Sequence, residues 1–102
     1  MHELIAQRRT EIEALCRGLQ IRRLDLFGSA VGGSFDPDTS DVDVLVEFDV
    51  QPGFDYFGTY FDLKEGLERI LGYPVDVVSA TSIRNPYFRA RVMCTRETLY
   101  AA

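Results

Sequence analysis

The amino-acid sequence predicts an α/β fold, in which helices stack against a mixed β-sheet. Segments with apolar residues at helical spacing alternate with short apolar-rich segments typical of strands, and a chain of 102 residues has room for one core. The composition, 46% hydrophobic and 26% charged, is that of an ordinary globular domain. We therefore expect a single domain over residues 1–102, with elements in the order α-β-loop-β-α-β-α.

Three segments are expected to form helices. In residues 4–19 the apolar positions are spaced roughly as on one helix face, and Gly18 lies near the end of the segment. In residues 55–71 apolar and aromatic residues recur at helical intervals, and Gly72 suits the end of a helix. Residues 86–93 are expected to form the last helix.

Four segments are typical of strands. Residues 21–27 and 74–79 are short and rich in apolar residues, and residues 98–102 are expected to form a short edge strand. Residues 28–39 are rich in Gly, Ser, Asp and Pro and predict a loop. Residues 41–48 alternate with the period of a strand. One face carries Val42, Val44, Val46 and Phe48, and the other carries Asp41, Asp43, Leu45 and Glu47.

The overall charge argues against several classes of protein. The chain has 11 basic and 16 acidic residues, a formal net charge of −5, which is unfavourable for a protein that coats nucleic acid. No apolar run is long enough to cross a membrane, no secretory signal is visible, and the two cysteines lack the spacing of metal ligands. We therefore expect a cytoplasmic protein without membrane contact or direct nucleic-acid binding.

Charge is also distributed unevenly along the chain. Residues 34–68 contain ten acidic residues and one lysine, whereas residues 82–102 contain four arginines and one acidic residue. Such charges can form a solvated surface, or the acidic centre can collect cations while the basic tail contacts phosphates or an acidic partner. Composition alone does not choose between these interpretations.

A turn that could approach a phosphate follows the first expected strand. Gly28 lets the backbone come close to a ligand, and the Ser29 hydroxyl can bond a phosphate oxygen. A Gly-Ser pair after a strand is more often a plain turn, so this signal is weak by itself.

Asp41 and Asp43 open the second expected strand. Because side chains alternate along a strand, both project to one face with their Cα atoms roughly 6.6 Å apart. Two carboxylates this close repel each other, and Mg²⁺, held by carboxylates and substrate phosphates, removes the conflict. The alternative is a pair of aspartates on a solvent-exposed strand face.

Asp76 lies among β-branched residues in a strand that we expect to be central. A carboxylate there is costly unless it is paired, protonated or bound to a metal. If its strand lies beside the one that holds the two earlier aspartates, the three form a triad. Otherwise, Asp76 is expected to point to water or to pair with Arg22 or Arg23.

Together these features predict a two-metal site for phosphoryl transfer. Two ions about 3.5–4 Å apart stabilise the attacking and the leaving oxygens of an in-line displacement. Asp41 and Asp43 would bridge the metals and a triphosphate. Asp76 would hold the catalytic metal and accept the proton of the attacking hydroxyl.

Three short motifs carry the most specific signal: Leu-Phe-Gly-Ser at residues 26–29, Ser-Asp-Val-Asp at residues 40–43 and Val-Asp-Val-Val at residues 75–78. At this spacing they resemble the minimal nucleotidyltransferases of the DNA polymerase β superfamily, and the resemblance covers nearly the whole chain. It implies a polymerase β-like catalytic core, two Mg²⁺ ions and a nucleoside triphosphate, usually ATP. Many family members are antitoxins that transfer AMP to a tyrosine of a HEPN-type ribonuclease toxin.

The resemblance assigns roles to two sets of residues. The nucleotide-binding residues that it implies are Gly28, Ser29 and Ser40. The metal-binding and catalytic residues that it implies are Asp41, Asp43 and Asp76. One position departs from the family pattern, because Gly32 stands where members often have an arginine. That substitution removes a contact to phosphate or to the scaffold.

The expected function is Mg²⁺-dependent transfer of AMP from ATP to a protein hydroxyl, with release of pyrophosphate. We expect the chain to act as antitoxin in a hetero-oligomer with a HEPN-type toxin, because so short a catalytic core needs an acceptor supplied by another protein. Two alternatives stay open: a non-catalytic module that neutralises its partner by binding, and a transferase that acts on a small-molecule hydroxyl.

Overall fold

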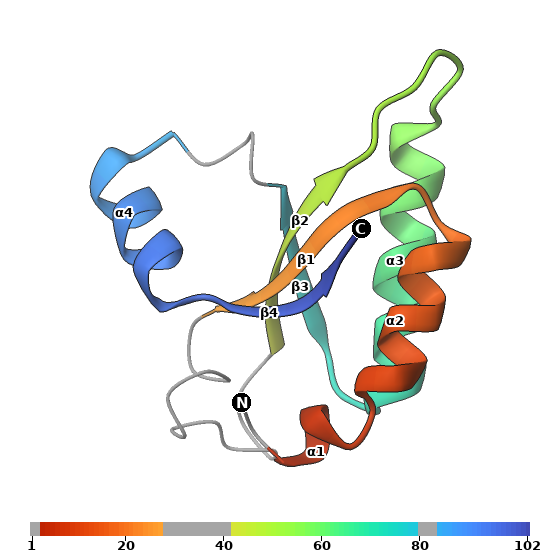
Figure 1. Cartoon of the computed structure of the whole chain (residues 1–102), viewed down its shortest axis with the longest axis horizontal. Helices are drawn as coiled ribbons and strands as arrows, with labels where there is room; N and C mark the ends of the chain where they lie inside the picture. Colours follow the sequence, from red (N-terminus) through yellow and green to blue (C-terminus); the bar gives the residue numbers. More distant parts are fainter. Residues whose placement is uncertain (1–2, 28–41, 80–83) are drawn as a thin grey trace.

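The computed structural model describes residues 3–27, 42–79 and 84–102. None of the helices in these ranges is long and apolar enough to cross a membrane. The elements (Figure 1) are α1 (Glu3–Ala6), α2 (Arg9–Gly18), β1 (Ile21–Phe27), β2 (Val42–Phe48), α3 (Tyr56–Leu71), β3 (Val75–Ser79), α4 (Pro86–Thr95) and β4 (Glu97–Ala101).

The strands form one mixed sheet in the order β3-β2-β1-β4. β1 pairs antiparallel with β2 and with β4, whereas β2 and β3 run parallel. A parallel pair needs a long crossover, and α3 supplies it between β2 and β3. The predicted mixed sheet is confirmed, and β4 lies at an edge as expected.

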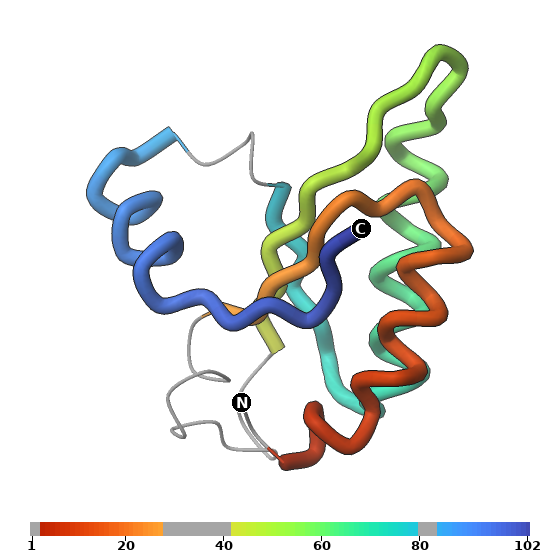
Figure 2. The backbone as a smooth tube through the Cα atoms, in the orientation of Figure 1, coloured from red at the N-terminus to blue at the C-terminus, as the bar shows by residue number. Residues whose placement is uncertain are grey.

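The two faces of the sheet are covered unequally. α2 and α3 lie together on one face, and α4 lies alone on the other (Figure 2). The main core lies under α2 and α3, where Val42, Val44 and Val46 are each 0% exposed. Leu45 belongs to a separate apolar cluster under α4. The predicted alternation is therefore confirmed, and it explains why β2 contributes to two cores.

Local signals set both ends of α3. The Asp55 carboxylate accepts a hydrogen bond of 3.0 Å from the backbone N–H of Gly58, which makes Asp55 an N-cap. At the other end Gly72 has φ +78°, a left-handed conformation that favours glycine, and its N–H donates to the carbonyl of Glu68. The helix begins and ends where the sequence predicts.

The first helix differs from the prediction, because the segment at residues 4–19 is two helices. α1 ends at Ala6 and α2 begins at Arg9. At the junction the Arg8 N–H donates to the carbonyl of Ile5, only three residues back. The tight turn accompanies burial of both Ile5 and Ile12 in the main core. The expectation of one continuous helix is therefore wrong.

The two cysteines are predicted to differ strongly in reactivity. Cys16 is buried in the main core, and burial, aided by the charge of Glu13, raises the pKa of its thiol to about 12. Cys94 is exposed on α4. At pH 8 we expect the exposed Cys94 to react quickly with Ellman's reagent and the buried Cys16 to react only after unfolding, because the thiolate is the reactive form. Equal rates for both thiols would contradict this assignment.

Candidate active site

Two of the predicted carboxylates meet on adjacent strands. Asp43 near the start of β2 is the direct register partner of Asp76 in β3. Neighbouring strands lie about 4.8 Å apart, so the two carboxylates can share one small cation. The sequence analysis expected a triad if the strand of Asp76 lies beside that of Asp43. The two strands are neighbours, so this condition is met.

The register of this pair is fixed by the valines on the opposite face of the sheet. Val42 pairs with Val75 and Val44 pairs with Val77, and all four side chains lie in the main core. A slip of one residue would turn Asp43 or Asp76 into that core and expose the valines instead. Apolar packing on one face thus holds the two carboxylates together on the other.

The surroundings of Asp76 differ from the expectation. β3 is an edge strand rather than a central one, and Asp76 is exposed while Asp43 is half-buried. The desolvation cost inferred from the sequence therefore does not arise for Asp76. Arg23 is not its partner, because Arg23 forms an ion pair with Asp25.

The other predicted site residues lie outside the described residues. These are Gly28, Ser29, Ser40 and Asp41, together with Gly32. The described chain leaves the sheet at Phe27, which is the register partner of Asp43, and resumes at Val42. The segment that contains them therefore joins two strand ends that flank the carboxylate pair.

The donor set fits a hard divalent cation. Within the described ranges, no group of three or more His, Cys, Asp or Glu side chains could hold a metal ion. Two aligned carboxylates at an accessible sheet edge still provide the oxygen ligands that Mg²⁺ prefers, and substrate phosphates normally complete its shell. The chemistry of Asp43 and Asp76 is thus compatible with the predicted Mg²⁺ site.

A third aspartate on this face of the sheet was not singled out from the sequence. Asp25 in β1 is only 1% exposed, and both of its carboxylate oxygens accept from Nε of Arg23 at 3.0 Å. Nη1 of Arg96, which caps the C-terminus of α4, lies 3.3 Å from Oδ2 of Asp25. Arg23 also donates to Thr98 in β4 at 2.9 Å. The cluster joins β1, β4 and α4. The sequence did carry one signal for this cluster, because Asp25 is a charged residue within the otherwise apolar run of residues 24–27.

A second polar junction holds β3 against α3. The Glu68 carboxylate accepts from the backbone N–H of Val75 at 3.0 Å and from Nζ of Lys64 at 3.3 Å. Nζ of Lys64 also donates to the carbonyl of Val75. These contacts fix the entry to β3 one residue before Asp76. The hydrogen bond from Val75 is the main cause that lowers the pKa of the Glu68 carboxyl, and Lys64 adds to it.

We predict that Glu68→Gln makes folding less sensitive to acid. Because the pKa of Glu68 is lower in the folded chain than in the unfolded chain, its carboxylate contributes stability above the unfolded pKa of about 4.3 and loses it as the pH falls through the folded pKa. The difference in unfolding free energy between wild type and variant should therefore be largest near neutral pH and should shrink below about pH 4. Urea titrations at several pH values measure it. A constant difference at all pH values would contradict the assignment.

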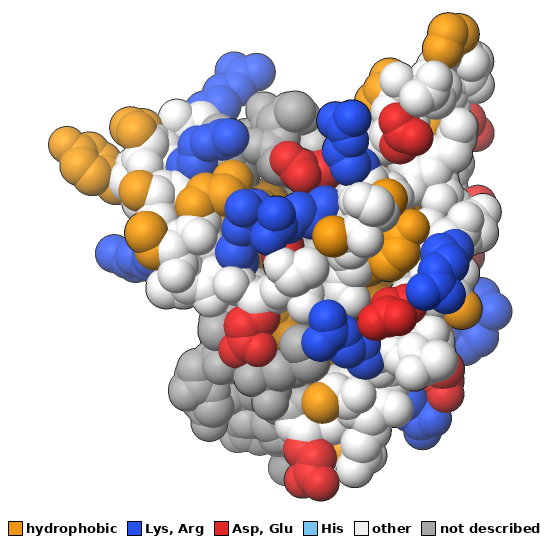
Figure 3. Space-filling view, viewed as in Figure 1, with side chains coloured by type: hydrophobic (Ala, Val, Ile, Leu, Met, Phe, Trp, Pro, Cys, Tyr) orange, Lys and Arg blue, Asp and Glu red, His pale blue; other side chains and the backbone are white. Residues whose placement is uncertain are grey.

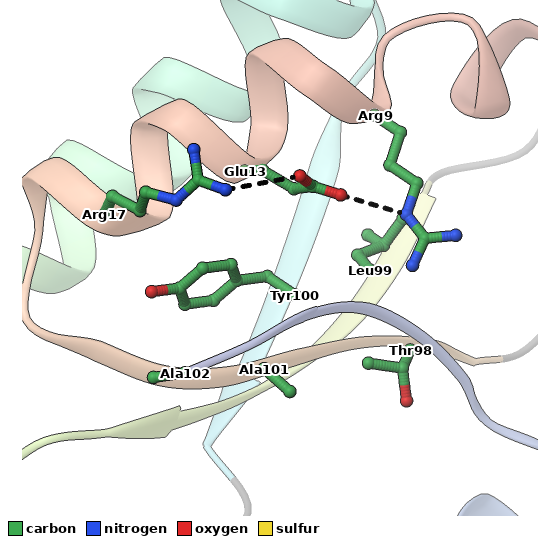
Figure 4. A pocket seen from close by; sticks show the side chains of 8 residues that line it. All are labelled: Arg9, Glu13, Arg17, Thr98, Leu99, Tyr100, Ala101 and Ala102. Atoms are coloured by element: carbon green, nitrogen blue, oxygen red, sulfur yellow. Dashed lines mark hydrogen bonds and ion pairs between the residues drawn. The ribbon is translucent and has the colours of Figure 1, made fainter.

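One hollow in the described part of the molecule lies away from the carboxylate pair. It has a volume of about 400 Å³ and lies between α2 and β4, where Arg9 and Arg17 flank Glu13 (Figure 4). β4 and β3 are opposite edges of the sheet, so this hollow cannot include Asp76. It does not belong to the candidate active site.

Comparison with known proteins identifies the family. The model of the nucleotidyltransferase domain matches residues 9–97. The chain belongs to the nucleotidyltransferase family. This nucleotidyltransferase is 38% identical over 73 residues to MJ1379 of Methanocaldococcus jannaschii, provisionally named a protein adenylyltransferase; the alignment covers 72% of this chain and 71% of the relative. It is 40% identical over 65 residues to the protein adenylyltransferase MntA of Thermococcus cleftensis, which covers 64% of this chain and 62% of the relative.

Solved structures have the same architecture as this nucleotidyltransferase. One, provisionally described as a minimal nucleotidyltransferase, superimposes with a TM-score of 0.76 at 30% identity and covers 93% of this chain and 92% of its own. Another, described as a tri-AMPylated HEPN toxin of Shewanella oneidensis in complex with an MNT antitoxin, gives a TM-score of 0.64 at 21% identity, over 95% of this chain and 72% of that chain. The resemblance to the minimal nucleotidyltransferases, and with it the enzyme class, is confirmed.

Proposed function

We propose that this nucleotidyltransferase transfers AMP from ATP to a tyrosine hydroxyl of a HEPN-type toxin in the cytoplasm and so acts as its antitoxin. The observation that carries the proposal is the alignment of Asp43 with Asp76 on neighbouring parallel strands of a nucleotidyltransferase domain. Relatives named as protein adenylyltransferases, and the AMPylated toxin in the Shewanella complex, support a protein as the acceptor.

The proposed site assigns a role to each predicted residue. Asp43 and Asp76, with Asp41, would hold Mg²⁺, which when bound neutralises charge on the triphosphate. Gly28, Ser29 and Ser40 would bind the phosphates of ATP, without the arginine that many relatives have at the position of Gly32. We further propose that residues 1–102 act as one catalytic domain.

The proposed reaction is one in-line displacement. The acceptor oxygen forms a bond to the α-phosphorus of ATP, the bond from that phosphorus to the oxygen that bridges to the β-phosphorus breaks, and pyrophosphate leaves. The proton of the acceptor hydroxyl passes to the carboxylate of Asp76, which is the more exposed of the two aligned carboxylates.

The test follows the label from ATP. Purified chain, Mg²⁺ and the product of the neighbouring gene are incubated with ATP labelled at either the α- or the γ-phosphate. We expect label in the partner protein from α-labelled ATP only, and mass spectrometry should locate it on a tyrosine. A stable complex without label would favour a non-catalytic module that neutralises its partner by binding. Label in a small molecule would favour a transferase that acts on a small-molecule hydroxyl.

A further inference from the structure

The end of β2 leads into a part of the molecule whose apolar side chains lie outside the core. It comprises residues 49–55 and the first turns of α3, and it projects beyond the sheet (Figure 1). Val50 is 70% exposed, Phe57 73% and Phe61 53%. With the exposed Tyr56 they present an apolar surface on the order of 400 Å², as large as the patches that mark interaction sites on single chains. We call these four residues the aromatic arm.

The aromatic arm is held in place by packing. The ring of Phe48, which packs against the main core, has its centroid 5.1 Å from that of Tyr56 and 5.5 Å from that of Phe54. Tyr56 in turn meets Phe57 edge-on at 5.8 Å. Asp55 caps the helix at the same point. A surface fixed in this way loses little conformational freedom when a partner covers it.

α3 therefore carries apolar residues on two sides. Leu67 is buried in the main core, whereas Phe57 and Phe61, four residues apart, are exposed. Aromatic residues at this spacing lie on one side of a helix, and helices present such anchors to a groove on another protein. Beside them is a hollow of about 200 Å³, lined in part by Val50 and Tyr56, with room for a side chain of that protein.

The surroundings of the aromatic arm are acidic. Residues 47–68 contain six acidic residues and one lysine. That lysine, Lys64, is bonded to Glu68 and to the carbonyl of Val75. Figure 3 shows apolar and acidic side chains together on this projecting part, at the upper right. The exposed acidic residues are Asp55, Asp62 and Glu65. A surface that complements the arm is therefore basic around an apolar centre.

The charge and the area together select the kind of occupant. A second copy of this chain, joined through the same surface, would bring like charges face to face. Anionic lipids and nucleic acids are disfavoured for the same reason. A protein with a basic rim is favoured. Because long-lived interfaces are the more apolar ones, and an uncovered apolar patch promotes aggregation, a permanent partner fits better than a transient one.

We propose that the aromatic arm binds an apolar groove with a basic rim on the protein with which this chain assembles as antitoxin. This inference rests on the proposed function and identifies the surface that holds the partner. The arm lies at the far end of β2 from the reaction centre, because Phe48 is five residues beyond Asp43, about 16 Å along the strand. Holding the partner and transferring AMP are thus separate tasks of separate residues.

The test removes the aromatic anchors or reverses the acidic charge. Phe57→Ser alone and with Phe61→Ser alters the anchors, and Asp62→Lys/Glu65→Lys alters the charge. Tyr87→Ser is the matched control for Phe57→Ser, since Tyr87 is also an exposed aromatic residue in the first turn of a helix. Circular dichroism and thermal melting verify that each variant folds.

The control for the charge reversal changes the net charge equally on another surface. Glu3→Lys/Glu11→Lys serves, because both residues are exposed on α1 and α2.

We expect Phe57→Ser/Phe61→Ser to bind the product of the neighbouring gene about thirtyfold more weakly, and both controls to bind within about twofold of wild type. Asp62→Lys/Glu65→Lys should also weaken binding. High salt should weaken wild-type binding more than that of the charge-reversed variant. At saturating partner, kcat and the affinity for a non-hydrolysable ATP analogue should not change.

Three outcomes would overturn the inference. The first is unchanged partner affinity in the double serine variant. The second is a dimer of the wild-type chain alone, seen by analytical ultracentrifugation, that the same variant loses. The third is binding of the wild-type chain to phosphatidylserine vesicles that the same variant loses.

The binding measurement also separates this inference from the proposed function, because it needs no AMP transfer. Partner binding that depends on the aromatic arm, in a chain that transfers no AMP, would sustain the inference and reject the enzyme function. AMP transfer to a partner whose affinity the arm does not affect would do the reverse.

Discussion

Asp43→Ala is expected to reduce AMP transfer by about a thousandfold, the loss that corresponds to about 4 kcal/mol of transition-state stabilisation. The substitution removes one of two aligned carboxylates and leaves Asp76 without its partner across the strand pair. Because Val42 and Val44 still anchor β2 in the core, the fold should persist. Initial rates of label transfer from α-labelled ATP, at saturating Mg²⁺, measure the loss.

A matched control lies on the same strand. Glu47 shares the face of β2 with Asp43 but sits four residues further along, about 13 Å away at 3.3 Å per residue. Glu47→Ala should therefore retain activity within a few-fold of wild type. If Asp43→Ala were as active as Glu47→Ala, the aligned pair would not be the reaction centre.

Asp25→Ala is expected to lower the free energy of unfolding by about 3 kcal/mol, because removing one partner of a buried ion pair leaves its counter-charge unpaired. Asp25 is 1% exposed and accepts from both Arg23 and Arg96. Without the carboxylate, two like charges would face each other between β1 and α4. Urea denaturation followed by circular dichroism gives the change.

The control for Asp25 is an ion pair on the surface. Glu11 lies 3.1 Å from Arg8, and both side chains are about half exposed, so Glu11→Ala should change stability by less than about 1 kcal/mol. Hydrogen exchange should also quicken in α4 for Asp25→Ala, since Arg96 caps that helix. If Asp25→Ala lowered the free energy of unfolding no more than Glu11→Ala does, the buried cluster would contribute little to stability.

Periodicity and capping were sufficient to predict most of the elements. Residues 41–48 alternate without interruption, and Asp55 and Gly72 bracket α3, so local chemistry defines these segments. The break between α1 and α2 could not be foreseen, because residues 7–9 contain no glycine or proline and the turn depends on packing of Ile5 in the core.

The sequence was less informative about position within the sheet. An aspartate among valines resembles a buried residue, yet Asp76 is exposed because β3 is an edge strand, and strand order depends on contacts far apart along the chain. The same limit applies to Asp25, whose partner Arg96 is 71 residues away. The pairing of Asp43 with Asp76 confirms that the strands of these two residues are neighbours in the sheet. The roles of both residues, and of the site residues outside the described ranges, stay predictions.

The outermost position of β3 affects how a large substrate could gain access. Within the described ranges β3 has a strand neighbour on one side only, and side chains of α3 bond the outer carbonyls of Val75 and Val77, so a macromolecular acceptor would reach Asp76 over the exposed face of the sheet. Such an approach requires no hinge between two lobes. A folded acceptor would then meet the site by diffusion, so the rate of transfer at low acceptor concentration should rise in proportion to that concentration.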